Sequence, residues 1–160
     1  MAQLVLLCPH VVPDYVSLHC RHFSVADGIH GARITGLKLM NGWTPLHSVA
    51  GKADGGCVSV GKNATLSLVN VSLLNCTAGN RGGAVFVGKD SQLTVRGAII
   101  SDCRAGLDGG GIYLGSGASL VMSESVLQNT SAGFLLASEL APEDRPEACI
   151  SNESWTGGGG

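Results

Sequence analysis

The chain has 160 residues, within the usual length of one domain, and carries a formal net charge of −2 with 14% charged residues. This balance provides no basic surface for DNA or RNA, so nucleic acid is excluded as an expected partner. No apolar run reaches the roughly 20 residues that a membrane-spanning helix needs, and we expect no membrane span in this chain.

The first part of the chain, residues 1–33, shows no regular repeat, and we expect irregular coils or a cap there. It also lacks the features of a secretion signal, because no basic residue precedes the apolar stretch, and Pro9 and Pro13 interrupt it. If the protein is exported, we expect its signal or anchor to lie outside this chain. Residues 34–42 match the end of a repeat unit moderately well.

A repeat with a period of 27 residues occupies the centre of the chain. Residues 55–61, 82–88 and 109–115 align without a gap, and Leu66, Leu93 and Leu120 share one column. Apolar residues alternate over short runs within each unit, which is the period of a β-strand and not of a helix. We therefore predict about three short strands per unit. The residues predicted to face inward in the first unit are Val58, Val60, Leu66, Leu68, Val71 and Leu73.

Short strands at a fixed period favour an all-β solenoid. The predicted fold is a right-handed, single-stranded parallel β-helix of about three clear 27-residue coils, with irregular flanking coils. A β-propeller would need units of about 40 residues or more, and the spacing of leucine-rich repeats is missing. The β-helix is expected over residues 34–135, with units starting at 55, 82 and 109. Glycine columns at 55/82/109, 61/88/115 and 79/106/133 are expected to form corners with positive φ.

After the third unit the repeat fails. Residues 136–150 contain Pro142 and Pro146 and predict a surface loop, while residues 151–160 match the start of a further, truncated coil. An uncovered end of a β-helix exposes unpaired strand groups. We therefore expect self-association through open β-helix ends.

A polar column follows the third strand of each unit, at a position that the alternation predicts to face inward. It consists of Asn75, Asp102 and Asn129. Stacked side chains about 4.8 Å apart can hydrogen-bond along the helix axis, so we interpret the column as a buried structural ladder. A calcium site is the weaker interpretation, since calcium usually takes several charged oxygen ligands. We predict no metal ligand, cofactor-binding residue or catalytic residue in these units.

The residues predicted to face outward are the candidates for catalysis and for binding. The first strands place Ser59, Phe86 and Tyr113 outward, and none of these is acidic. Enzymes that cleave polysaccharides generally need paired carboxylates or a carboxylate with a base, so the pattern argues against an enzyme without deciding the question. Phe86 and Tyr113 are candidate surface contacts for a carbohydrate or another surface protein. Equally, they can be neighbours that a loop covers.

Six cysteines allow about 15 pairings, and the sequence does not identify the pairs. Cys76 and Cys103 occupy one column, one repeat apart. Neighbouring parallel strands lie about 4.8 Å apart with nearly parallel Cβ directions, which suits a disulfide poorly. We expect two free, neighbouring thiols at these positions.

Asparagine is followed by Ser or Thr at the second position in five of seven cases. This excess over chance favours a eukaryotic secretory route. Asn63, Asn70 and Asn152 are the candidate glycosylation sites. Asn75 and Asn129 are expected to face inward, where a glycan cannot be accommodated.

Two motifs carry a resemblance to a known class of repeats. They are Gly-Gly-Ala-Val-Phe at 82–86, and the triplets Leu-Leu-Asn, Ile-Ser-Asp and Leu-Gln-Asn that end at Asn75, Asp102 and Asn129. The chain resembles the pectin-lyase-like right-handed β-helices, most closely the chlamydial polymorphic outer-membrane protein repeats and similar microbial or algal surface proteins. It departs from the chlamydial pattern with Leu73, Ile100 and Leu127 where Phe is usual.

The resemblance implies a non-catalytic segment of an extracellular or cell-surface protein, acting as a structural spacer or adhesion surface, with no cofactor. The alternative hypothesis is a fragment of a carbohydrate-active β-helix enzyme, either a polysaccharide lyase or a glycoside hydrolase.

Overall fold

The computed structural model describes residues 4–6, 21–45 and 53–133, and every regular element in these ranges is a β-strand. The first ranges contain β1 (Leu4–Leu6), β2 (Phe23–Val25), β3 (Ala32–Thr35) and β4 (Lys38–Met40). Each later unit contributes four strands. They are β5 (Val58–Val60), β6 (Thr65–Val69), β7 (Ser72–Leu74) and β8 (Thr77–Ala78), then β9 (Val85–Val87), β10 (Gln92–Arg96), β11 (Ile99–Ser101) and β12 (Arg104–Ala105), then β13 (Ile112–Leu114), β14 (Ser119–Ser123), β15 (Val126–Gln128) and β16 (Ser131–Ala132).

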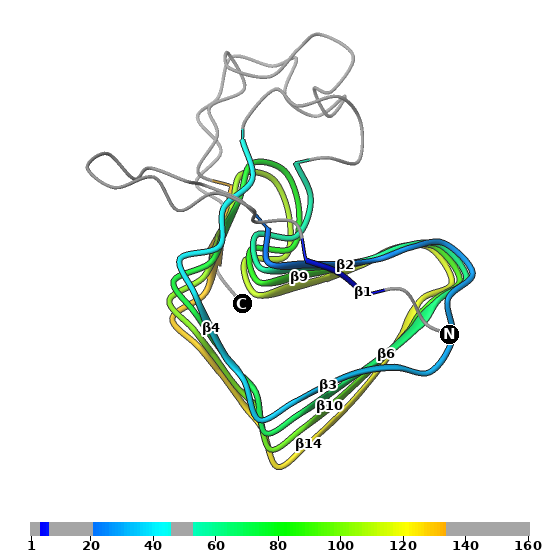
Figure 1. The fold of residues 1–160 in the computed structure, drawn as a ribbon. Coiled ribbons are helices and arrows are strands. Elements are labelled where there is room, and N and C mark those ends of the chain that lie inside the picture. Colours follow the sequence, from blue (N-terminus) through cyan, green and yellow to red (C-terminus); the bar gives the residue numbers. More distant parts are fainter. Residues whose placement is uncertain (1–3, 7–20, 46–52, 134–160) are drawn as a thin grey trace, which may run out of the picture.

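Equivalent strands of successive units pair side by side and form four sheets. Their orders are β1-β2-β5-β9-β13, β14-β10-β6-β3, β15-β11-β7-β4 and β16-β12-β8. Every pair is parallel except β1 with β2. Figure 1 shows the units lying over one another along one axis. The described chain is therefore all-β with parallel sheets, an arrangement compatible with a parallel β-helix.

The pairing register follows the predicted repeat. Leu93 lies beside Leu66 on one side and beside Leu120 on the other, as the 27-residue period requires. The earlier unit joins the same sheets with longer offsets, since Ala32 lies beside Leu66 and Phe23 beside Val58. The extra length lies in the turns and not in the strands.

The core consists of the inward side chains of three sheets. All six residues predicted to face inward in the first unit are buried, with exposed fractions of 2% or less. The core continues into the second unit through Val85, Val87, Leu93, Val95 and Ile100, all at 0% exposure. The alternation of apolar residues therefore predicted the buried face of these strands correctly.

A fourth strand in each unit was not predicted. β8, β12 and β16 each contain two residues and pair in parallel with one another. An alternation of period two needs a longer run before it becomes visible, so a two-residue strand leaves no signal in the sequence.

The predicted inward position of the Asn75, Asp102 and Asn129 column is wrong. All three side chains are exposed, and their φ angles are 52°, 57° and 50°. A residue in the left-handed region turns the chain sharply, and the period-two alternation of the preceding strand does not continue through it. Side-chain hydrogen bonds still connect neighbouring units at this corner. Asn75 Nδ2 donates to Asn41 Oδ1 at 2.8 Å, and Asn129 Nδ2 donates to Asp102 Oδ1 at 3.2 Å.

The three glycine columns differ, and in the column of Gly79, Gly106 and Gly133 only Gly133 has the predicted positive φ, at 77°. Gly55, Gly82 and Gly109 have the predicted positive φ, at 71°, 69° and 63°. The column of Gly61, Gly88 and Gly115 does not have a positive φ, contrary to the prediction. There the units approach too closely for a side chain, because a Cβ on Gly88 would lie 2.7 Å from the carbonyl carbon of Gly61.

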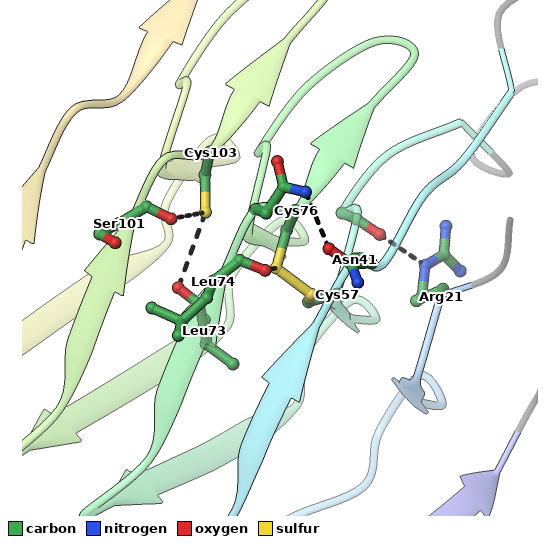
Figure 2. Close-up of a disulfide and its surroundings, with 10 residues drawn as sticks. Arg21, Asn41, Cys57, Leu73, Leu74, Cys76, Ser101 and Cys103 are labelled. Carbon is green, nitrogen blue, oxygen red and sulfur yellow. Dashed lines mark hydrogen bonds between the residues drawn. A yellow bond between two sulfur atoms is a disulfide. The ribbon is translucent and has the colours of Figure 1, made fainter.

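The expected pair of free thiols is also wrong in part. Cys76 forms a disulfide with Cys57, with the two Cα atoms 5.6 Å apart, while Cys103 is a buried free thiol. Figure 2 shows the disulfide beside Cys103, whose Sγ contacts the carbonyl oxygens of Ser101 and Leu73 at 3.1 and 3.8 Å. The partner of Cys76 lies across the interior of its own unit and not on the next one.

Several predictions fall outside the described residues. These are the loop at 136–150, the further coil at 151–160, the sequon at Asn152 and most of the N-terminal region 1–33. Within the described ranges there is no helix with the length and apolar character needed to cross a membrane.

Candidate ligand groove

A groove of about 470 Å³ lies over the outer face of the sheet that contains β2, β5, β9 and β13. Its strand residues come from successive units, and its charged residues come from the turns at both ends of these strands. The side chains that line it include Ser59, Phe86, Tyr113, Arg21, Asp54, Arg81, Asp27, Lys62 and Lys89.

One outward column crosses the groove and changes from small to large side chains. Ser24 lies beside Ser59, Ser59 beside Phe86, and Phe86 beside Tyr113. The rings of Phe86 and Tyr113 stack with centroids 5.5 Å apart and an angle of 7° between their planes. Both are partly exposed. The two predicted surface contacts therefore lie together in the groove, although their role in binding stays a prediction.

A charged column stands beside the aromatic pair. Asp54, Arg81 and Asp108 are spaced by 27 residues, each directly before the first glycine of its unit. The Arg81 amide donates to Asp54 Oδ1 at 3.2 Å, and Arg81 Nε lies 3.3 Å from Asp108 Oδ2. The Arg81 guanidinium carbon is 5.3 Å from the centre of the Tyr113 ring. Exposed contacts of this kind contribute only about 1 kcal/mol or less each, so their main effect is to orient the guanidinium.

Asp54 is the most buried acidic group of the groove, with 7% of its surface exposed. Burial raises the pKa of Asp54, while its hydrogen bond from the Arg81 amide and the charges of Arg81 and Arg21 oppose this rise. Arg21 Nε donates to the Gly55 carbonyl at 3.0 Å, and Arg21 Nη2 donates to the Asp54 carbonyl. Burial lowers the pKa of Arg21, and the charge of Asp54 raises it.

Positive side chains outnumber negative ones along the groove. Arg21, Arg81, Lys62 and Lys89 line it together with the carboxylates Asp27 and Asp54. Asp27 Oδ1 accepts a hydrogen bond from the Lys62 amide at 2.7 Å, and Asp54 is buried beside two guanidinium groups. The groove is therefore locally basic, although the whole chain has a net charge of −2.

Sequence reasoning missed Arg21, Asp54 and Arg81. The signal for Asp54 and Arg81 was present, because they share the 27-residue column with Asp108, with charges that alternate in sign. Arg21 belongs to the earlier unit, whose longer offset hides the alignment. Two other carboxylates in the turns are exposed: Asp90 Oδ2 lies 3.7 Å from Lys89 Nζ, and Glu124 Oε2 lies 3.5 Å from Arg96 Nε.

Histidine, cysteine and acidic side chains do not gather into a group of three or more that could hold a metal ion anywhere in the described ranges. Comparison of the chain with protein-family models, with curated proteins and with solved structures finds no match. The resemblance to microbial surface repeats therefore stays a prediction.

Proposed function

We propose that this chain is a segment of a right-handed parallel β-helix from an extracellular or cell-surface protein. In this proposal the repeat acts as a rigid spacer, and the groove beside Phe86 and Tyr113 is an adhesion surface for carbohydrate. The proposal includes kinship with the microbial surface repeats that the Gly-Gly-Ala-Val-Phe motif resembles.

The observation that carries the adhesion role is the stacked pair of Phe86 and Tyr113 in a groove with charged walls. Small-molecule sites are concave and combine aromatic surface with a few placed polar groups, and this groove combines both. Tyr113 adds a hydroxyl to its apolar ring, and Arg81 adds donors directly beside it. These are the groups that a sugar ring with its hydroxyls requires.

The spacer role is supported by the continuous core. Inward aliphatic side chains pack from Phe23 to Cys103 in one cluster, and each sheet runs through all the repeat units. Since every unit contacts only its neighbours, length can be added without changing the packing. The Cys57–Cys76 disulfide further supports an oxidising location outside the cytosol.

Binding of an immobilised glycan library by the purified chain tests the adhesion role. Phe86→Ser, which extends the serine part of the column, is expected to weaken binding about tenfold. Val121→Ser is the matched control, because Val121 is an outward, exposed apolar residue on a different sheet. Equal binding by the parent, Phe86→Ser and Val121→Ser would reject this surface as the binding site.

The second candidate function is the carbohydrate-active enzyme. Asp54 favours it, because a buried carboxyl with a raised pKa in a groove is suited to general acid catalysis. Its test is the release of reducing ends or of unsaturated sugars from polysaccharides that bind. If polysaccharide is turned over, and Asp54→Asn abolishes the turnover but retains binding, the enzymatic function replaces the adhesion proposal.

A further inference from the structure

The three tight turns between the four sheets share one backbone conformation in every unit. Nine corner positions, three per unit, all have positive φ: 63, 70 and 75, then 90, 97 and 102, then 117, 124 and 129. Asn, Asp and Gly adopt this conformation most readily, and four of the nine residues are asparagines. The corner geometry therefore explains why asparagine is frequent at these positions.

That geometry does not explain the residue two positions later. Each of the four corner asparagines is followed there by Ser or Thr, namely Thr65, Ser72, Thr77 and Ser131. After the five corners that are not asparagine, the residues at this position are Gln92, Ile99, Arg104, Ser119 and Val126. A hydroxyl residue follows all four corner asparagines but only one of the other five corners, at Ser119. This is the pattern expected of a glycosylation acceptor sequence.

Only one of the four hydroxyl groups has a hydrogen-bonding role in the described structure. Thr65 Oγ1 accepts a hydrogen bond from the Gly31 amide at 2.7 Å. Among the described residues, the hydroxyls of Ser72, Thr77 and Ser131 make no hydrogen bond that would require them. The fold therefore does not require a hydroxyl group at these three positions.

All four asparagines are exposed, including the two that sequence reasoning had placed inside. Asn75 Nδ2 donates to Asn41 Oδ1, and Asn129 Nδ2 donates to Asp102 Oδ1 (Figure 2 shows the bond to Asn41). An amide nitrogen that carries a glycan keeps one N–H, so modification leaves a donor for the ladder.

We propose that N-linked glycans are attached at Asn75 and Asn129 as well as at Asn63 and Asn70. In the reaction the amide nitrogen attacks C1 of a lipid-diphosphate-linked oligosaccharide. The new N–C1 bond replaces the C1–O bond to phosphate, the amide loses one proton, and the lipid diphosphate leaves. Three glycans then surround the first unit, one at each of its tight turns.

The fourth turn, which closes a unit, carries no acceptor in the described residues. It leads from β8 to β9 past the charged column, and its Asn80 is followed two residues later by Gly82. The glycans therefore border both edges of the two sheets that contain β6 and β7. The end of the groove where Arg81 meets Tyr113 stays free of them, while Asn63 directly follows Lys62 at the other end. The modified corners thus border these two sheets and leave the Arg81 end of the groove open.

The test is expression of the full chain behind a cleavable secretion signal in eukaryotic cells, with both the endoplasmic-reticulum pool and the secreted pool collected. Enzymatic release of N-glycans in heavy-oxygen water converts each occupied asparagine to labelled aspartate. Peptide mapping is expected to find the label at Asn63, Asn70, Asn75 and Asn129. Glycosylated protein that enters the secreted pool is expected to keep a cooperative melting transition.

Matched variants remove the acceptor and keep the corner residue. Thr77→Val and Ser131→Ala are each expected to lose one glycan, at Asn75 and Asn129 respectively, while the other sites stay occupied. Asn41 serves as the unmodified reference, because it has the same backbone conformation but is followed by Gly42 and Trp43. Unlabelled Asn75 and Asn129 in both pools, from chains whose signal has been cleaved, would overturn the proposal. Glycosylated protein that no longer melts cooperatively would overturn it as well.

Discussion

The second and third units have the same sequence pattern but very different surroundings. In the second unit Leu93 and Ile100 are completely buried, since each lies between equivalent residues on both sides. In the third unit Leu120 is only partly buried, and Leu127 is 45% exposed. The strands β13 to β16 each stand at the end of their sheet among the described residues.

This difference separates the direction of a side chain from its burial, two properties that the sequence pattern does not distinguish. Alternation decides which side chains point inward, but burial depends on a neighbouring unit on each side. Hydrophobic stabilisation follows the area removed from water, so the same leucine column contributes more in the second unit than in the third. Matched substitutions in equivalent columns of the two units test this difference.

The largest effect is expected from a charge in the leucine column of the second unit. Leu93→Asp should abolish cooperative folding, because an unpaired buried carboxylate costs several kcal/mol. Leu120→Asp is the matched change in the third unit and should still give a cooperative transition with lowered stability. Urea unfolding followed by circular dichroism measures both. Overlaying curves for the parent and Leu93→Asp would show that this column is not core.

A smaller effect is expected from giving the second unit the cross-link of the first. Ala84 stands one repeat after Cys57, and Cys103 one repeat after Cys76, so Ala84→Cys should form a disulfide with Cys103. Closing a loop of this length contributes about 3 kcal/mol in the chain-entropy account. Peptide mapping without reduction detects the bond, and melting with and without reductant measures its effect. Ala98→Cys, buried elsewhere in the same unit, should leave its thiol free.

The structure also shows why sequence reasoning succeeded for the strands and failed at the corners. Alternation predicted the inward side chains of β5, β6 and β7, because extended backbone has a fixed period. It misplaced Asn75, because a positive φ ends that period. The disulfide was missed for a related reason: sliding the chain along itself reveals neighbours in adjacent units, whereas Cys57 and Cys76 face each other across one unit.

Recognition of the candidate groove was similarly partial. The column of Phe86 and Tyr113 was visible, since stacking along the repeat follows directly from the 27-residue period. Asp54 and Arg81 share a column as well, but their opposite charges hide the equivalence when residues are compared by similarity. A search for columns of alternating charge would have found them.

A third prediction concerns the third unit, whose strands stand at the ends of their sheets among the described residues. Leu114, Val121, Val126 and Leu127 are exposed apolar residues there, and edge strands offer unpaired backbone groups. We expect the purified chain to self-associate in the micromolar range, as measured by sedimentation over a series of concentrations. Val126→Lys should weaken this association, because charged side chains protect sheet edges. A concentration-independent monomer would show that the edge is covered in solution.

The smallest effect is expected at Asp54, where stability should depend on pH. Burial raises the pKa of Asp54 in the folded state above the ordinary value of 3.8. The group therefore destabilises the fold increasingly as the pH rises from the unfolded pKa to the folded pKa. Each unit of difference between the folded and unfolded pKa is worth about 1.4 kcal/mol. Asp54→Asn keeps an oxygen acceptor for the Arg81 amide and removes the buried charge. The variant should therefore be more stable than the parent at pH 7, and the difference should disappear at acid pH.

Thermal melts at a series of pH values measure this difference directly. Asp108→Asn is the matched control, because its side chain is 63% exposed and pairs with the same arginine. Exposed ion pairs contribute about 1 kcal/mol or less, so the control should change stability little. If Asp54→Asn is instead less stable than the parent at neutral pH, the attraction of Arg21 and Arg81 outweighs the cost of burial. The carboxylate would then be a charged anchor of the groove wall, which removes the argument for Asp54 as a general acid.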